Sequence, residues 1–225
     1  IIINMKKIVF SLASIVFLVS CGGESTNNNT SKVPTKDSSV ISTPVLEKIC
    51  KKGYDKESTS IGFGGFKTKE KKEVKGYFKD FTIDSTIVAD SPEEVFANAT
   101  FSVPVNYLET NDLGRNGRII DEYFGNMEET SNIKGKVVGF NTDSNKVNVE
   151  ITLNAIKQTV ALNYTVSGDT ISLNGNINIL DFNGSKALAA LNTACEVLHK
   201  GADGVSKTWA DVSLYISSVV KEACE

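Results

Sequence analysis

Two residues able to act as nucleophile and base, Cys195 and His199, lie four positions apart in the sequence. On a helix this spacing places both side chains on one face, so a thiolate–imidazole pair is one interpretation. Cys195 also belongs to an apolar stripe with Leu188, Leu191 and Leu198, and a buried thiol is inert. His199 would lie in the last helical turn, where the helix dipole favours a cation. The sequence therefore favours structural roles for both, and no catalytic residue and no enzyme activity are expected.

Arg115 and Arg118 are the two arginines of the chain and lie three positions apart. A guanidinium group can hold a phosphate or carboxylate through two parallel hydrogen bonds, so contact with an anionic head group is one role for this pair. The alternative is an ion pair with Asp121 or Glu122, which follow Arg118 at helical spacing. The sequence favours the ion pair and leaves the head-group contact open.

The sequence offers few residues for a phosphate-binding loop, a metal site or a nucleic-acid interface. Gly62-Phe63-Gly64-Gly65 lacks the Gly-Lys-Ser/Thr ending of a phosphate-binding loop, and a bulge in a strand explains it better. With one histidine and no Cys-x-x-Cys motif, the chain offers no set of zinc, haem or iron–sulfur ligands. A net charge of −3 gives no general affinity for nucleic acid. The lysines from Lys67 to Lys75 alternate with Glu70 and Glu73, which is typical of a solvated hairpin tip.

Cys21 ends an apolar run that follows Lys6 and Lys7 and is shorter than the roughly 20 residues needed to cross a bilayer. The residues Leu18-Val19-Ser20-Cys21 resemble the lipobox of bacterial lipoproteins, in which the cysteine is acylated and the peptide is cut before it. The resemblance implies a membrane-anchored protein of the bacterial cell envelope that faces the periplasm. Gly22 stands where an Asp often retains lipoproteins at the inner membrane, so we expect the outer membrane. An ordinary signal with an incidental cysteine is the alternative.

The sequence divides into three parts. Residues 1–20 are expected to be a signal peptide that is removed. Residues 21–46 comprise the lipidated cysteine and a tether rich in Ser, Thr and Asn, which has too few large apolar residues to fold. Residues 47–225 have a globular composition and a length that suits one domain.

Apolar and polar residues alternate along much of the globular part. The alternation is clearest in 95–108, 146–156, 159–166 and 170–180. A period of two indicates a strand with one buried face. Further strands are expected in 57–68, 73–84, 133–141 and 208–220, which makes about eight. Residues 142–145 and 167–169 are typical of turns, and Pro104 indicates an edge or a bulge.

Two segments do not alternate. Asp112–Met127 resembles a loop with a short helix, whereas Ser185–Lys200 is a helix that Ser185 would cap and Gly201 would end. Strands with one apolar face bury it most economically by closing into a barrel, which removes the sheet edges. The expected fold class is therefore all-β, an eight-stranded antiparallel barrel with one or two short helices.

Three cysteines remain if Cys21 is lipidated, so one of them is unpaired. In a closed meander the first and last strands are antiparallel neighbours. Cys50 precedes the first strand and Cys224 follows the last, so we expect these two to form a disulfide. Cys195 would then be a buried free thiol, and a Cys50–Cys195 bridge is the alternative.

Several segments, in the same order, are similar to those of YceI-like, polyisoprenoid-binding periplasmic proteins. Val74–Phe81 resembles the V-x-G-x-F-x-x-F segment of that family, and Phe101–Val105 resembles its central strand. Arg115–Ile119 with Tyr123-Phe124 resembles its Arg-Asp-x-x-Leu…Phe-Phe stretch, although Asn116 replaces the Asp. Ile151–Val160 resembles its L-T-L-N-G-V-T-K-x-V hairpin. The resemblance covers most of 58–182 and implies a lipocalin-like barrel.

The resemblance also implies a long-chain isoprenoid, or an isoprenoid quinone, held in a tunnel through the barrel. This lipid would be the ligand of the domain, which is otherwise expected to need no cofactor or metal. Alternation along the strands predicts that the tunnel wall includes Phe63, Phe78, Phe101, Val103, Val105, Phe124, Val149, Ile151, Leu162, Leu214 and Ile216. A structural envelope lipoprotein with a filled core, or less plausibly an enzyme, is the alternative.

The lipobox generates a first prediction. If Cys21 is acylated, replacing it in Cys21→Ala should move the protein from the membrane fraction to the soluble fraction, because the acyl chains are the anchor. Cell fractionation with immunoblotting, including a high-salt wash, measures this. A Cys21→Ala protein that stays with the membrane after the wash would contradict the anchor.

Overall fold

The computed structural model describes residues 50–224. The expected signal peptide, Cys21 and the tether up to residue 46 lie outside the described residues. Among residues 50–224, no helix is long and apolar enough to cross a membrane.

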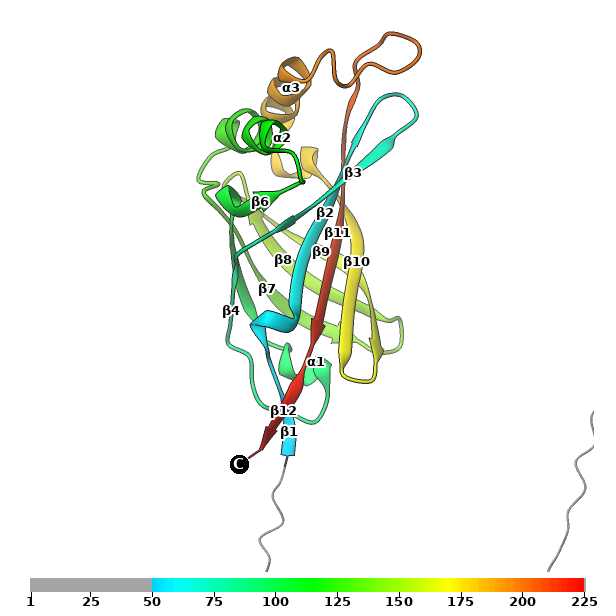
Figure 1. The fold of residues 1–225 in the computed structure, drawn as a ribbon. Helices are drawn as coiled ribbons and strands as arrows, with labels where there is room; N and C mark the ends of the chain where they lie inside the picture. Colours follow the sequence, from blue (N-terminus) through cyan, green and yellow to red (C-terminus); the bar gives the residue numbers. More distant parts are fainter. Residues whose placement is uncertain (1–49, 225) are drawn as a thin grey trace, which may run out of the picture. The chain divides into compact units, whose positions relative to one another are not determined.

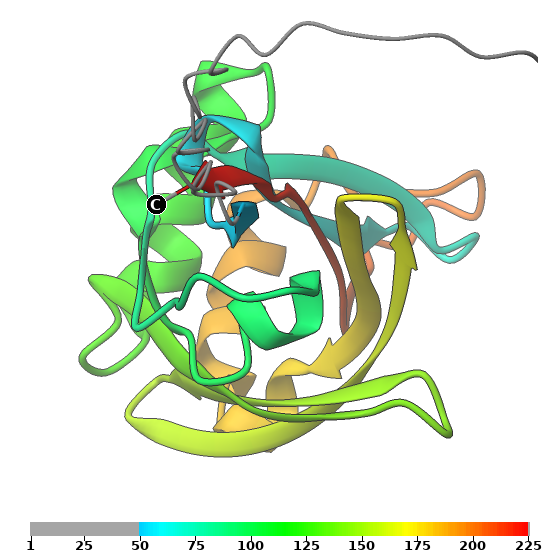
Figure 2. The same ribbon diagram turned by 90° about the horizontal axis from the view of Figure 1, so that it is seen from below.

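Ten strands form one antiparallel sheet in the order β4-β5-β7-β8-β9-β10-β11-β2-β3-β6 (Figure 1). The strands are β2 (Thr59–Lys67), β3 (Lys72–Phe78), β4 (Thr82–Asp84), β5 (Thr100–Pro104), β6 (Leu108–Glu109), β7 (Asn132–Asn141), β8 (Lys146–Leu153), β9 (Ile156–Ser167), β10 (Thr170–Asn178) and β11 (Thr208–Val219). Seen from below, the sheet curls around a central space into a barrel-like wall (Figure 2). The all-β antiparallel fold class is confirmed.

Alternation explains these strands. In β8, Val147, Val149, Ile151 and Leu153 are buried, whereas the residues between them are more exposed. Tight turns connect β7 to β8 and β9 to β10 at the two places where the sequence predicted them, and β2 to β3 through the lysine-rich tip. Each strand therefore turns its apolar face toward the inside of the curl.

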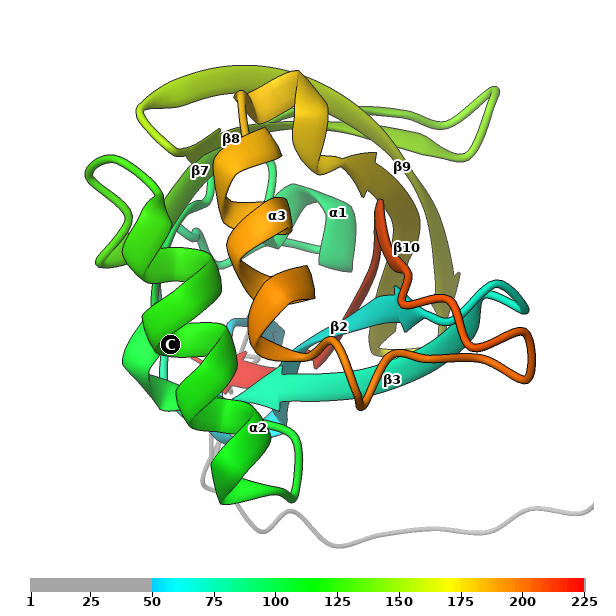
Figure 3. The same ribbon diagram turned by 90° about the horizontal axis from the view of Figure 1, so that it is seen from above.

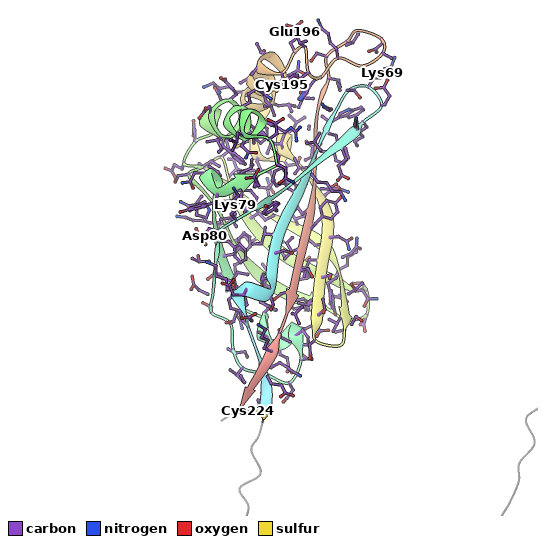
Figure 4. The ribbon with its side chains drawn as sticks, viewed as in Figure 1. Lys69, Lys79, Asp80, Cys195, Glu196 and Cys224 are labelled. Carbon is purple, nitrogen blue, oxygen red and sulfur yellow. A yellow bond between two sulfur atoms is a disulfide. The ribbon has the colours of Figure 1, made fainter. Side chains whose placement is uncertain are left out.

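The number of strands differs from the eight expected, because two expected strands are each divided by a bend. The segment 72–84 forms β3 and β4, and the segment 100–109 forms β5 and β6. Pro104 has no N–H for a ladder, and the 3₁₀ turn η2 (Val105–Tyr107) follows it. Both bends meet, since the Lys79 N–H donates to the Tyr107 carbonyl at 2.9 Å. Lys79 and Asp80 mark this bend in Figure 4.

The prediction of a strand over 95–108 was wrong for its first residues, because β5 begins only at Thr100. The helix α1 (Pro92–Val95) begins at Ser91, whose side chain accepts from the Glu94 N–H while the Glu94 carboxylate accepts from the Ser91 N–H. This capping box, with Pro92 in the first turn, favours a helix start more strongly than the alternation favours a strand. Buried Val95 belongs to the core, and α1 lies across the lower end of the curl (Figure 2).

The other end of the curl is covered by helical segments (Figure 3). They are α2 (Leu113–Arg118), the π-helix η3 (Ile119–Tyr123), the 3₁₀ turns η4 (Phe124–Asn126) and η5 (Ile179–Phe182), and α3 (Ser185–Ala194). A further 3₁₀ turn, η1 (Lys56–Ser58), precedes β2. The expected loop with a short helix is thus a longer helical run.

The helix α3 is shorter than expected. Gly184, rather than Ser185, is its N-cap residue and makes no side-chain cap, and the helix ends at Ala194 instead of near Gly201. The stripe is interrupted as a result, because Cys195 is buried whereas Leu198 is 52% exposed. Residues 195–207 form an irregular connection, in which Lys200 and Ser206 make an isolated bridge.

The first and last described segments pair at the lower end. The strands β1 (Cys50–Gly53) and β12 (Lys221–Cys224) form a separate two-stranded ribbon, in which Cys50 stands opposite Cys224. The two cysteines form a disulfide, and Cys195 is a buried free thiol. This is the pairing that the sequence favoured over Cys50–Cys195. Figure 4 places Cys224 and Cys195 near opposite ends of the domain.

A buried carboxylate connects α2 to the sheet. Glu109, in β6, is 7% exposed and pairs with the Lys79 ammonium. Its Oε1 also accepts from the Asn116 side chain at 2.9 Å and from the Asn111 N–H at 2.6 Å. Asn116, the residue that replaces an expected Asp, also accepts from the N–H and the hydroxyl of Thr110. Lys79 and the two donors lower the pKa of Glu109 from 4.5 to about 2.

The disulfide generates a second prediction. It joins residues 174 positions apart, for which the chain-entropy model gives an upper value of about 4–5 kcal/mol of stabilisation. Cys50→Ala, Cys224→Ala and the double variant should therefore lose the same stability, since each removes the same bond. Chemical unfolding with and without reductant measures this. Equal unfolding midpoints for oxidised and reduced wild type would contradict the prediction.

Glu109 generates a third prediction, on pH. A carboxyl whose pKa is lowered by folding stabilises the fold above its ordinary pKa, and this contribution is lost as the pH falls through the folded-state value. Glu109→Gln resembles the protonated carboxyl, so its thermal unfolding midpoint should lie below that of wild type at pH 7. The difference between the two midpoints should narrow between about pH 5 and pH 2. The control is Glu128→Gln, at an exposed side chain. A gap that does not change with pH would contradict the role of Glu109.

Candidate binding cavity

The curled sheet and the helices that cover it enclose a cavity of about 250 Å³. Its wall contains no charged side chain, and most of it is aliphatic or aromatic. The volume exceeds that of the engineered apolar cavity of about 150 Å³ that binds benzene. The interior is therefore large enough and apolar enough to hold a hydrocarbon group.

The cavity wall extends along most of β11. It includes Thr208 and Ser218, which lie near the two ends of β11. Ten residue steps of a strand correspond to about 30 Å. At the lower end the wall includes Phe96 beside α1, and at the upper end Leu188 and Leu191 of α3. A modest volume spread over this length fits a chain-shaped molecule better than a compact one.

The structure places ten of the eleven expected wall residues on the cavity: Phe63, Phe78, Phe101, Val103, Phe124, Val149, Ile151, Leu162, Leu214 and Ile216. Val105 is the exception. Val105 is buried, but it lies in the 3₁₀ turn η2 and is not part of the wall. The alternation counted it as a strand residue, whereas the bend after Pro104 changes its direction. That the wall residues contact a ligand stays a prediction.

Glycines on neighbouring strands explain why large side chains line the cavity without filling it. Phe63 stands opposite Gly76, and Phe101 stands opposite Gly135. At each glycine, a Cβ atom would clash with the ring of the opposite phenylalanine. Each ring therefore lies across the bare backbone of the next strand and stays close to the wall, an arrangement known to stabilise strand glycines.

Alternation along the strands did not predict every residue of the cavity wall. Ile119 and Tyr123 come from η3, Leu188 and Leu191 from α3, and Trp209 from the start of β11. The apolar stripe of α3 could have indicated Leu188 and Leu191, because a helix with one apolar face must pack that face against another element. The π-helix left no such signal in the sequence.

Polar groups on the wall are mostly satisfied by the protein. The Thr59 and Ser218 hydroxyls lie 2.7 Å apart, and Thr59 also donates to the Asp55 carbonyl. The Trp209 indole donates to the Thr68 carbonyl at 2.7 Å. Thr208 donates to the Asn192 side chain at 2.9 Å. Burial raises the pKa of Tyr123 well above its usual value.

The two arginines do not lie on the cavity wall. Arg115 pairs with Asp112 at 3.3 Å and donates to the Thr110 carbonyl, so its partner is neither Asp121 nor Glu122. Arg118 makes no ion pair within the described part of the chain, and its buried Nε atom has no hydrogen-bond partner there. Both arginines lie close enough to His199 to affect its pKa.

Cys195 and His199 are not arranged as a nucleophile and its base. His199 Nδ1 lies 2.7 Å from the Thr208 hydroxyl, and Cys195 is 4% exposed. Burial, together with the nearby cations Lys67, Arg118 and Arg115, lowers the pKa of His199 to about 4. His199 is therefore neutral at neutral pH and fixes the start of β11. Gly62–Gly65 lies within β2, as a strand segment.

Solved structures of similar fold come from several bacteria. BcnA of Burkholderia cenocepacia is 16% identical, with a TM-score of 0.51, and the match covers 75% of this chain and 99% of that one. A polyisoprenoid binding domain from Saccharophagus degradans is 13% identical, with a TM-score of 0.52, over 77% of this chain and 98% of that one. No curated protein matches the sequence.

The model of one protein family matches most of the described domain. The match is to the YceI-like domain and spans residues 53–217, from the end of β1 almost to the end of β11. It therefore includes every strand of the ten-stranded sheet and the helices that cover the cavity. The chain belongs to the YceI-like domain family.

Proposed function

We propose that this protein binds one long apolar molecule, an isoprenoid, along the cavity inside its curled sheet. The observation that carries the proposal is the long cavity whose wall has no charged side chain. The neighbour from Saccharophagus degradans is named a polyisoprenoid binding domain, which supports this class of ligand for the family. Binding would come from buried apolar area, at about 25 cal/mol per Å² before the costs of ordering the chain.

We further propose that the domain is an envelope lipoprotein anchored through an acylated Cys21 and facing the periplasm, with the outer membrane as its site. The support is the lipobox resemblance of residues 18–21 and the composition of the tether. Residues 22–49 could reach at most about 100 Å when extended.

A carrier or storage role is favoured over a purely structural one. A structural lipoprotein would gain stability from a filled core, because empty space in a core is destabilising. Here Phe63 and Phe101 are held against the wall and leave the centre open. No assembled catalytic constellation was found among the described residues, and we propose no reaction.

Protein from its native envelope should contain the ligand. Purification without detergent, extraction with organic solvent and mass spectrometry should show one isoprenoid lipid in near-stoichiometric amount. Trp209 is the single tryptophan and lies on the wall, so its emission should also change when an isoprenoid alcohol or quinone is added. Absence of lipid in the native protein, together with no binding at micromolar concentrations, would overturn the proposal.

A blocking substitution generates a fourth prediction. Ile151→Trp places a larger ring on the wall and should strongly reduce the lipid extracted per protein, at a cost of about 1–3 kcal/mol from overpacking. The matched control is Val138→Trp on β7, because Val138 is 55% exposed and is not on the wall. Native mass spectrometry of both variants compares their occupancies. Equal lipid content in Ile151→Trp and Val138→Trp would show that the ligand does not use this cavity.

A further inference from the structure

Tyr123 differs from the other polar residues on the cavity wall. Thr59, Thr208, Trp209 and Ser218 all have hydrogen-bond partners in the protein. The Tyr123 hydroxyl has none among residues 50–224, although its ring lies on the wall and packs edge-on against Phe124 at 5.3 Å between centroids. Buried tyrosine hydroxyls usually have a partner. An atom of a ligand in the cavity could supply the missing partner.

Tyr123 is a residue of the cavity wall and is partly accessible. Burial raises its pKa strongly, which agrees with a hydroxyl shielded from bulk water. These two properties fit a side chain whose free surface belongs to the internal cavity that it lines. Tyr54 is different: its hydroxyl also lacks a partner, but that atom has no accessible surface and Tyr54 is not on the wall.

The backbone that carries Tyr123 is itself unusual. Residues Ile119–Tyr123 form a π-helix, and such turns are frequent at functional sites. In a π-helix, hydrogen bonds join residues five apart, so the residues four and five after Ile119 lie on nearly the same face as Ile119. Ile119, Tyr123 and Phe124 accordingly all lie on the wall. In a regular α-helix Phe124 would turn away.

The wall also restricts the charge of a head group. It contains no Lys, Arg or His, and Arg115 and Arg118 lie outside it. A phosphate or carboxylate without a cationic partner is costly to bury. A tyrosine hydroxyl is protonated at neutral pH, and burial raises the pKa of Tyr123 further, so Tyr123 can donate a hydrogen bond to an uncharged oxygen or accept one from a hydroxyl.

We propose that the Tyr123 hydroxyl hydrogen-bonds an uncharged oxygen at the head of the chain bound in the cavity, and so selects such a head group over a phosphate. The inference rests on the proposed lipid binding and assigns a specificity-determining residue to the same cavity. It makes Tyr123 a binding residue and Arg118 no part of the head-group contact.

A fifth prediction tests this with Tyr123→Phe, which removes only the hydroxyl. The probes are farnesol, the hydrocarbon farnesene and farnesyl phosphate, with affinities read from Trp209 emission. Tyr123→Phe should weaken farnesol binding about three- to tenfold, the usual worth of one hydrogen bond, and leave farnesene binding unchanged. In wild type, farnesyl phosphate should bind more weakly than farnesol. The control is Tyr77→Phe, since Tyr77 is 44% exposed and off the wall, and it should change none of the affinities.

The outcomes separate the two proposals. Wild type that binds none of the probes would overturn the proposed function, and this inference with it. Wild type that binds farnesol equally well with and without the Tyr123 hydroxyl, or prefers farnesyl phosphate, would overturn the inference alone. Should Tyr123→Phe fail to fold, the ¹³Cζ resonance of Tyr123 in labelled wild type decides: it should shift with farnesol and not with farnesene, and equal shifts would overturn the inference.

Discussion

The pairing of β2 with β11 is the contact on which the rest of this structure depends. It joins the beginning of the folded chain to its end, with Ser218 opposite Thr59 and Leu214 opposite Phe63. Without it the ten-stranded sheet would divide between β11 and β2. The pairing is reinforced at both ends, by the Cys50–Cys224 disulfide below and by the Trp209–Thr68 hydrogen bond above. A contact of such long sequence separation is costly to form, which explains the reinforcement.

The curl of the sheet creates an interior that the side chains do not fill. The phenylalanines on β2 and β5 lie across glycines of the adjacent strands, so their rings stay beside the wall. An unfilled apolar interior lowers stability relative to a packed one. Such a cavity, whose polar wall groups are nearly all satisfied by the protein, suits the apolar ligand proposed for it.

The two ends of the curl have different roles. The disulfide ribbon and α1 lie at the lower end, where the chain enters and leaves the domain (Figures 1 and 2). The helical segments at the upper end supply side chains to the cavity, and Glu109 connects them to the sheet through Asn116 and Lys79. A charged group that is hydrogen-bonded on several sides fixes geometry well. Helix α2 and the π-helix after it are therefore held in the position that brings Tyr123 to the wall.

The sequence by itself determined the all-β class, the turns, the helix near residue 185 and the side of each strand that faces inward. These features depend on local patterns, on a period of two or on the residues of a turn, and Val149, Ile151 and Leu214 follow from them. The disulfide partners also followed, because the strand order of a meander brings its two ends together.

Only the tertiary structure decided how the inward side chains are used. Alternation shows that Phe63 and Val105 share an inner face, but it cannot show that a glycine on the next strand holds the first against the wall or that a bend turns the second away. Two expected strands are divided into β3 and β4 and into β5 and β6. This division, which gives a sheet of ten strands, depends on where the curled sheet must bend. Tyr123 reaches the cavity through a π-helix that no local pattern indicates, since its place is set by packing against α3 and by the Glu109 cluster.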